Sequence, residues 1–435
     1  MIWAYRLLFL PAFIFVLPYY LLRMLRRGGY ARDFEHRFGS IGPFPAKRPG
    51  VRRIWIQAVS VGEINATTPL LRALAARDDT EIVLTTTTST GYAIAREKLA
   101  PFTMATGVFP LDFWLFSHCA WDSIQPDLVV LMEGELWPEH LHQATKRKIP
   151  AILINARLSD RSFRRYAKVK SLGASLLAQL RHIGAATPED ASRFEKLGVP
   201  AEKITLTGNL KFDVGDNTDC SPQEKQALLK ALGFITTDNS PPPPVLLGSS
   251  TWPGEEAMLL EVLSQARARQ IPLKLLLVPR HAERRNEIAE LLAKTSFEWF
   301  LRSQHNNAPH PADVCIADTT GELRYLTSVA TLAFIGKSLP PNEGGQTPID
   351  CAALGVPMVY GPAMTNFRDI CKGLENAAAA QRVNDTDCAI QTLLNLLDDT
   401  EARTRLGDNA RAWHTANRGA TTRTLELIVP LLRAG

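Results

Sequence analysis

The sequence lacks the residue patterns that mark most metal, redox and triphosphate-binding sites. Its six cysteines include no CxxC pair, which argues against a zinc site or a disulfide framework in a chain of 435 residues. It contains no GxGxxG, no HExxH and no GxSxG. The nine histidines have no metal-ligand spacing. We therefore predict no metal site and no cofactor.

Two short matches to ligand-binding motifs are incomplete. Gly336-Lys337-Ser338 looks like the end of a P-loop, but Thr331 stands where the first glycine of the phosphate loop is needed. Asp385-Thr386-Asp387 resembles the DxD of metal-dependent sugar-nucleotide enzymes. It directly precedes the helical run CAIQTLLNLL, where Asp and Thr are expected as helix caps. The expectation at both places is ordinary structure.

Basic residues are concentrated at the N-terminus. Hydrophobic residues make up 46% of the chain and charged residues 21%, which is ordinary for a folded globular protein. Residues 1–53 hold ten Lys and Arg against two Asp and Glu, so a net charge of +5 leaves −3 for the remaining residues. This distribution argues against a nucleic-acid-binding protein. It points to an anionic surface near the N-terminal end.

The first hydrophobic run, residues 2–22, contains a single charge, Arg6. As a helix it would reach about 31 Å, roughly the thickness of a hydrocarbon core. The arginines at 23, 26, 27 and 32 follow the run, whereas a secretory signal places its charge before the run. We predict an N-terminal anchor over residues 1–30, either spanning a membrane or lying in its interface, with the rest on the cytoplasmic face.

Apolar runs alternate with amphipathic ones in two series, which predicts two parallel sheets covered by helices. Residues 214–243 end in three of four consecutive prolines and are predicted to be a linker. The predicted domains are therefore 31–213 and 244–435, each a Rossmann-like α/β unit, with a cleft between them. The predicted strands are 52–59, 81–88, 107–111, 127–132, 150–157, 182–187 and 204–213, then 244–251, 273–280, 313–318, 331–336 and 357–362.

Acidic residues follow two of the predicted strands of the first domain. Ser60 and Glu63 have the spacing of a helix-capping box, which would explain both residues. Alternatively, Glu63 is a carboxylate at the mouth of the strand that takes a proton from a hydroxyl. Glu133 and Glu135 flank Gly134 at another strand end, where either a bound ligand or a charged loop opening a helix would explain them.

Cations and glycines follow other predicted strands. Lys211, Arg280 and His281 suit phosphate or carboxylate ligands, and solvated surface cations are the alternative. The segment 344–350, GGQTPID, opens a helical stretch. Its paired glycines would let a ligand approach the backbone, and Asp350 would accept hydrogen bonds from ribose hydroxyls. A loop followed by an acidic first helical turn is the alternative.

Taken in order, these residues resemble the Kdo transferases, which add 3-deoxy-D-manno-octulosonic acid (Kdo) to lipid A precursors. The resemblance covers nearly the whole chain, and many ordered motifs are more specific than any one alone. The motifs are AVSVGE (58–63), EGELWPE (133–139), INARLSDRSFRRY (154–166), TGNLKFD (207–213), LVPRH (277–281), DTTGEL (318–323), GGQTPIDCAALGVPMVYGP (344–362) and NFRDI (366–370).

The resemblance implies an inverting, metal-independent glycosyltransferase of the GT-B type that uses CMP-Kdo in lipopolysaccharide core assembly. By similarity, Glu63 takes the place of the catalytic base, and the first domain binds the acceptor, an acylated and phosphorylated disaccharide. The residues implied on the acceptor side are Ser60, Gly62, Glu133 and Glu135. The residues implied on the donor side are Lys211, Arg280, His281, Glu322, Gly344, Gly345, Gln346 and Asp350.

The chain departs from the family pattern in two places. Gly134 stands where members usually have Thr, and the glycine loop, usually GGHNPLEP, has Gln346, Thr347 and Asp350 in this chain. Because the loop is implied in donor binding, transfer from a different nucleotide sugar on the same fold is the alternative function. An inactive membrane-tethered binding protein is a second alternative, which the retained charged residues at strand ends disfavour.

Overall fold

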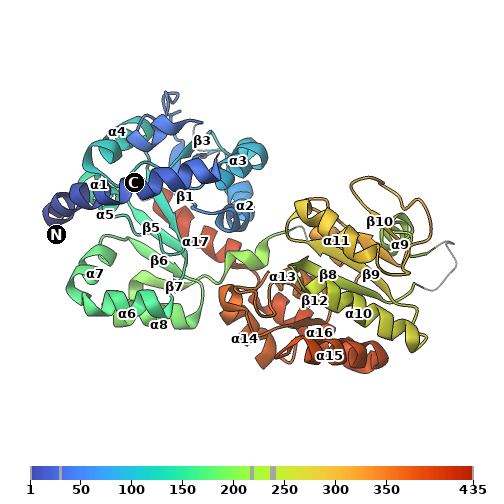
Figure 1. The fold of residues 1–435 in the computed structure, drawn as a ribbon. Coiled ribbons are helices and arrows are strands. Elements are labelled where there is room, and N and C mark those ends of the chain that lie inside the picture. The colour runs from blue at the N-terminus through green and yellow to red at the C-terminus, as the bar shows by residue number, and fades with distance from the viewer. Residues whose placement is uncertain (1, 29–31, 216–219, 236–241, 434–435) are drawn as a thin grey trace. The chain divides into compact units, whose positions relative to one another are not determined.

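The computed structural model describes residues 2–28, 32–215, 220–235 and 242–433. The chain divides into two compact units (Figure 1). The first unit comprises Met1–Gly215 and Asn417–Gly435, and the second comprises Asp216–Ala416. Each unit contains a seven-stranded sheet in which every pair of neighbouring strands is parallel. The prediction of two Rossmann-like α/β units is confirmed.

The sheet of the first unit has the strand order β3-β2-β1-β4-β5-β6-β7. The order reverses between β1 and β4, and ligands of open parallel sheets bind outside the carboxyl ends of the strands at such a switch point. The strands are β1 (Arg52–Gln57), β2 (Thr80–Thr86), β3 (Ala105–Val108), β4 (Leu128–Met132), β5 (Ala151–Ala156), β6 (His182–Ala185) and β7 (Ile204–Leu206).

Helices pack on both faces of this sheet. Because side chains alternate along a strand, Trp55 of β1 enters the core on one face, whereas Ile54 and Ile56 enter the core on the other. The helices are α1 (Ile2–Arg27), α2 (Val61–Ala75), α3 (Ser89–Lys98), α4 (Trp114–Ile124), α5 (Pro138–Arg147), α6 (Asp160–Lys168), α7 (Lys170–Leu177), α8 (Pro188–Lys196) and α17 (Ala420–Arg433), with the 3-10 helices η1 (Phe34–Phe38), η2 (Ala100–Phe102), η3 (Ala201–Lys203) and η4 (Leu210–Asp213).

The last helix, α17, belongs to the first unit, although the sequence assigned all of 244–435 to the second domain (Figure 1). Its side chains Ile428 and Leu432 are buried in a core cluster of the first unit. The Asp213 carboxylate accepts hydrogen bonds from the backbone N–H groups of Gly419 (2.9 Å) and Thr421 (2.6 Å). The apolar face of α17 is therefore covered by the core of the first unit, where it packs against α2 and η4.

The sheet of the second unit has the order β10-β11-β9-β8-β12-β13-β14, with its switch point between β8 and β12. Its strands are β8 (Val245–Thr251), β9 (Lys274–Pro279), β10 (Trp299–Leu301), β11 (Val314–Ile316), β12 (Leu332–Ile335), β13 (Met358–Tyr360) and β14 (Gln381–Arg382). Its helices are α9 (Pro222–Ala231), α10 (Glu255–Ala268), α11 (Arg285–Leu292), α12 (Leu323–Thr327), α13 (Ile349–Leu354), α14 (Arg368–Asn376), α15 (Thr386–Asp398) and α16 (Thr400–Asn417), with η5 (Ala282–Arg284) and η6 (Thr365–Phe367).

Local capping fixes two helices of this unit. The segment predicted as a linker contains α9, whose Ser221 and Glu224 form a capping box and whose Leu228 is buried. Asp385 caps α15 by accepting a hydrogen bond from the N–H of Cys388 at 2.8 Å. The DxD-like triplet therefore has the capping role that the sequence predicts.

Candidate active site

Glu63 lies in the first turn of α2, which follows β1 at the switch point of the first sheet. Its carboxylate accepts hydrogen bonds from the N–H of Val59 (2.8 Å) and from the hydroxyl of Ser60 (3.0 Å). The Ser60 hydroxyl also caps α2 by accepting from the N–H of Glu63 (3.4 Å). In a capping box the carboxylate would bind the N–H of Ser60 itself. Here the carboxylate instead accepts the N–H of Val59, one residue before Ser60, so that each of its two oxygens has a hydrogen-bond donor.

The environment of Glu63 favours its protonated form. The residue is only 8% exposed. Burial raises the pKa of its carboxyl group, the hydrogen bond from Val59 opposes this rise, and the negative charge of Glu133 adds to it. A carboxylate with a raised pKa is a better proton acceptor than one at the ordinary value. Glu63 is therefore both fixed in position and suited to general base catalysis.

Glu133 lies at the end of β4, on the other side of the switch point. Its backbone has φ 54°, in the left-handed region that non-glycine residues seldom adopt. Its carboxylate accepts hydrogen bonds from Lys211 Nζ (2.8 Å) and Asn155 Nδ2 (3.4 Å). The same Asn155 accepts the N–H of Leu210 (3.0 Å), so one amide links the ends of β4 and β5 to η4.

Glu135 is the most strongly perturbed acid of this group. Burial and then the negative charge of Glu63 raise its pKa to about 7. Burial and then the charge of Glu135 raise the pKa of the Tyr166 hydroxyl. The carboxyl ends of β1, β4 and β5 thus carry carboxyl groups, one lysine and one phenol close enough to influence one another. Such a concentration of perturbed groups is typical of functional sites.

The structure brings together the predicted base Glu63 and the four residues predicted for the acceptor side, and their roles stay predictions. These four are Ser60, Gly62, Glu133 and Glu135. Lys211, implied on the donor side, lies in the first unit beside Glu133. Sequence reasoning gave no role to Asn155 or Tyr166. A polar Asn near the end of the buried run AILINA was a usable signal for Asn155, whereas Tyr166 offered only its place in a family motif.

In the second unit, an internal carboxylate occupies the loop after β12. Glu255 is 2% exposed and accepts hydrogen bonds from the backbone N–H groups of Lys337 (2.9 Å), Ser338 (3.0 Å) and Trp252 (2.9 Å). The N–H groups of Lys337 and Ser338 belong to the segment that resembles the end of a P-loop. They are therefore engaged by the protein itself.

Basic side chains gather around Trp252, beyond the end of β8. Lys337 Nζ lies 4.4 Å from the centre of the indole ring, and the ring of His281 meets it edge-on at 5.4 Å. The side chain of Arg280 is exposed, while its N–H binds the carbonyl of Thr251 at 3.2 Å. Arg280 and His281 thus lie at the carboxyl ends of the central strands, where anionic ligands of such sheets bind.

Two predicted donor-side acids have arginine partners within the second unit. Glu322 accepts two hydrogen bonds from Arg302 in a bidentate arrangement (2.8 and 3.0 Å), and these bonds lower the pKa of its carboxyl group. Asp350 accepts from Arg324 Nη1 at 3.2 Å. Sequence reasoning missed both arginines. Any ribose contact of these acids would be made by carboxylates already oriented by an arginine.

The two glycines of the 344–350 loop are required by the fold. Gly344 and Gly345 have φ of 103° and 70°. An added Cβ would lie 2.6 Å from Asn366 Nδ2 at the first position and 2.3 Å from Met364 Sδ at the second. The helix that follows, α13, has only six residues. Internal packing therefore explains these glycines, and Gln346 is half-buried beside them.

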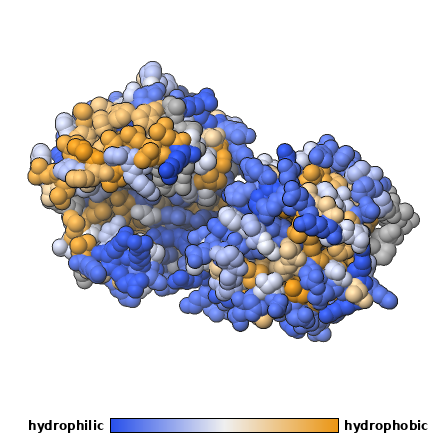
Figure 2. All heavy atoms as spheres, in the orientation of Figure 1, coloured by the Kyte–Doolittle hydropathy of each residue, from blue (hydrophilic) through white to orange (hydrophobic). Residues whose placement is uncertain are grey.

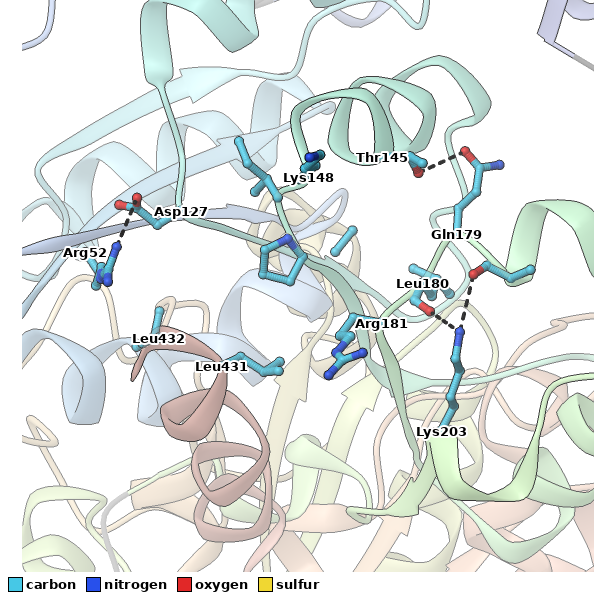
Figure 3. A pocket seen from close by; sticks show the side chains of 14 residues that line it. Arg52, Asp127, Thr145, Lys148, Gln179, Leu180, Arg181, Lys203, Leu431 and Leu432 are labelled. Atoms are coloured by element: carbon cyan, nitrogen blue, oxygen red, sulfur yellow. Dashed lines mark hydrogen bonds and ion pairs between the residues drawn. The ribbon is translucent and has the colours of Figure 1, made fainter. Parts of the chain in front are cut away.

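A groove of about 600 Å³, lined by several Lys and Arg side chains, lies at the amino ends of β1, β5 and β6 (Figure 3). This is the end of the strands opposite to the one that carries Glu63 and Glu133. Arg52 pairs with Asp127 (3.7 Å), and Lys203 donates to the carbonyl of Leu180 (3.3 Å). Among the residues that the structure describes, none of the predicted site residues lines this groove. The predicted site and the groove are therefore separate.

Within the described part of the chain, one group of potential metal ligands occurs beside β3. Ligand atoms of Asp33, Glu35 and His36 lie within 4.8 Å of one another. The Asp33 carboxylate accepts from the Tyr92 hydroxyl and pairs with an arginine, and His36 Nδ1 accepts the N–H of Val108 (3.3 Å). Two of the three groups are therefore already engaged in holding the N-terminal segment.

Comparison with known proteins shows the family of the chain. A family model described as 3-deoxy-D-manno-octulosonic-acid transferase (kdotransferase) matches residues 32–214. The 3-deoxy-D-manno-octulosonic acid transferase of Haemophilus influenzae is 35% identical, over 93% of this chain and 92% of that protein. The chain belongs to the Kdo transferase family. The transferase of Bordetella pertussis is 34% identical, over 93% of this chain and 94% of that protein.

The fold of this Kdo transferase family member also has solved relatives. A putative UDP-N-acetylglucosamine 2-epimerase from Listeria monocytogenes superimposes with a TM-score of 0.58 at 13% identity, covering 88% of this chain and 98% of that one. At this identity the likeness establishes the fold alone, and it agrees with the predicted GT-B class. The predictions of family, fold class and glycosyltransferase activity are confirmed.

Proposed function

We propose that this Kdo transferase family member transfers Kdo from CMP-Kdo to an acylated, phosphorylated disaccharide precursor of lipid A, during lipopolysaccharide core assembly at the cytoplasmic face of the inner membrane. The observation that carries the proposal is Glu63. It is a buried carboxylate with a raised pKa, held by two hydrogen bonds at the switch point of the first sheet. The N-terminal helix α1, apolar enough to associate with a membrane, suits a lipid acceptor.

In the proposed reaction, a primary hydroxyl of the acceptor attacks the anomeric carbon of Kdo. A new carbon–oxygen bond forms while the bond between that carbon and the phosphate oxygen of CMP breaks. Glu63 takes the proton of the attacking hydroxyl, a contribution of about 10²–10⁴-fold in rate. The fixed orientation of both its oxygens keeps the acceptor hydroxyl aligned and limits the entropy lost in the transition state.

The departing CMP gathers negative charge, which cations must stabilise. Arg280 is exposed at the end of β9 and is free to approach a phosphate. Lys211 is paired with Glu133, so we assign it to the acceptor side, where its positive charge offsets repulsion among the neighbouring carboxylates. The carboxylate of Kdo itself is a second anion that these cations would bind.

The test is a transfer assay with purified protein in detergent, CMP-Kdo and a tetraacylated lipid A precursor, with products weighed by mass spectrometry. We expect mass increments of Kdo, and their number gives the number of sugars added. If the folded protein adds no sugar while another Kdo transferase is active in parallel, the donor assignment is wrong. The same assay with UDP-sugars then tests the alternative donor.

The variant Glu63→Gln tests the assigned base. It keeps the side-chain size but cannot accept a proton, so we expect transfer to fall by at least about 10²-fold with unchanged CMP-Kdo binding in calorimetry. Glu202→Gln, on exposed η3, is the matched control. Normal turnover by the Glu63 variant would mean that the residue only holds the start of α2.

A further inference from the structure

Helix α1 is fastened to the first unit by polar contacts in its first turns. The only charged residue of the 2–22 run, Arg6, donates two hydrogen bonds to Glu139 of α5, both 2.8 Å long. Glu139 is fully buried, with 0% exposure. The neighbouring Tyr5 hydroxyl donates to Asp112 Oδ2 at 2.6 Å. Each of these acids therefore has one partner on α1 in addition to donors of the first unit itself, and we call the four residues Tyr5, Arg6, Asp112 and Glu139 the α1 latch.

Contacts continue along the rest of the helix. Phe9 stacks on Phe113 with ring centres 5.5 Å apart. Near the other end, the Tyr20 hydroxyl accepts a hydrogen bond from Arg37 (3.0 Å), and Met24 is buried. The helix therefore lies along the surface of the first unit from its first turns to its last (Figure 1).

This position is incompatible with crossing a membrane. By length and composition α1 qualifies as a membrane-spanning helix. At 1.5 Å per residue, Arg6 lies about 31 Å along the helix from its end at Arg27, which is roughly the thickness of the hydrocarbon core. If α1 crossed the bilayer, Arg6 would be on the far side from Glu139. The latch and a membrane-spanning orientation therefore exclude each other.

The outer face of α1 is strongly apolar. Phe15 is 86% exposed and Trp3 72% exposed. The exposed large hydrophobic residues of the region extend beyond the helix onto η1 and α4, and Figure 2 shows hydrophobic residues gathered over this part of the first unit. We call them the apolar face: Trp3, Leu7, Leu8, Leu10, Ile14, Phe15, Val16, Tyr19, Leu21, Leu22, Leu25, Phe38, Trp114 and Leu115.

Charge near the apolar face indicates what covers it. Arg26 and Arg32 are exposed at and just beyond the end of α1. Residues 1–53 carry the excess of basic residues, whereas the rest of the chain has a net negative charge. An apolar face with aromatic residues and flanking arginines matches the interface of an anionic bilayer.

We propose that α1 does not cross the membrane but lies in the plane of its cytoplasmic interface, held on the first unit by the α1 latch, with the apolar face inserted among anionic lipids. The helix and α4 then form one lipid-binding surface, and the first unit is held at the bilayer in a fixed orientation. This goes beyond the proposed function, because it depends on neither the donor sugar nor the acceptor.

Cross-linking in native membranes tests the latch. In a background with exposed Cys119 and Cys388 replaced by serine, the pair Arg6→Cys and Glu139→Cys is treated with a short thiol cross-linker. We expect cross-linking in membranes as well as in detergent, and none for a control pairing Arg6→Cys with Glu202→Cys. Cross-linking only after solubilisation would overturn the proposal, because the helix would then leave the first unit in the bilayer.

Flotation with vesicles tests the shared surface. We expect the wild-type protein to bind phosphatidylglycerol vesicles at least tenfold more tightly than phosphatidylcholine vesicles. Leu115→Asp on α4 should weaken binding about as much as Leu8→Asp on α1, with cross-linking of the latch unchanged. Binding that ignores Leu115→Asp, or that is equal for both lipids, would overturn the proposal, because a spanning helix needs neither α4 nor anionic lipid.

Discussion

The raised pKa of Glu135 makes the stability of the first unit depend on pH in a direction that can be worked out. The pKa of this carboxyl group rises from 4.5 to about 7 through burial and the charge of Glu63. Between these pH values the folded state holds a proton that the unfolded state has lost, so stability falls as pH rises through this window and is level above it. The stabilising contribution is complete only below about pH 4.5.

The size of the effect follows from the same values. One pKa unit corresponds to about 1.4 kcal/mol, so the difference amounts to roughly 3 kcal/mol, and partial exposure of the side chain reduces it to about 2–3 kcal/mol. The variant Glu135→Gln removes the ionisation. The difference in Tm between Glu135→Gln and the wild-type protein should therefore increase from pH 5 to 7 in favour of the variant and then stay constant. Its full size should be roughly 5–10 °C for a unit of this size.

The assay is thermal unfolding of both proteins in detergent between pH 5 and 8.5, with exposed Glu202→Gln as control. The variant Glu63→Gln adds an internal check, because removing the neighbouring charge should lower the pKa of Glu135 and end the loss of stability at a lower pH. Parallel pH profiles for wild type and Glu135→Gln would refute the reasoning. The carboxyl group would then ionise equally well in the folded and unfolded states.

The remaining predictions concern three residues, Gly62, Gly345 and Arg6, whose surroundings in the structure define what a substitution should change. An added Cβ at Gly62 meets only Ser60 Oγ at 3.8 Å, so Gly62→Ala should leave Tm unchanged or higher and raise the KM for the acceptor, and an unchanged KM would place the acceptor elsewhere. Gly345→Ala forces a Cβ against Met364 and should destabilise the second unit by about 1–3 kcal/mol in calorimetry. Equal stability would contradict the required close approach. Arg6→Met should lower the free energy of unfolding by about 3–5 kcal/mol, because it leaves the buried carboxylate of Glu139 without its arginine. The double variant with Glu139→Met should recover most of the lost Tm. No loss of Tm in Arg6→Met would mean that water solvates the pair.

Much of the fold could be predicted from the sequence because long apolar strands separated by amphipathic helices permit few arrangements. The strands that escaped prediction, β10 and β14, have three and two residues, too few to show a pattern. The amphipathic pattern of α17 indicates that one face must be covered but not by which core. That choice depends on contacts with residues about 200 positions earlier, such as Asp213.

The candidate site could be predicted in its charged residues but not in their partners. Glu63 and Glu133 follow recognisable strands, so their positions near the switch point were accessible from sequence. The pairing of Glu322 with Arg302 bridges 20 residues between two loops, and no periodicity connects them. The left-handed backbone of Glu133 was equally hidden, because this side chain carries no preference for that conformation.

The return of α17 to the first unit has a consequence for how the protein is made. During synthesis, domains ordinarily fold in the order in which they leave the ribosome. The first unit cannot follow that order, because Ile428 and Leu432 belong to its core and are translated after every residue of the second unit. The second unit has its whole chain available earlier. The first unit is therefore completed after the second, and a ribosome stalled short of α17 leaves an open core beside the apolar helix α1.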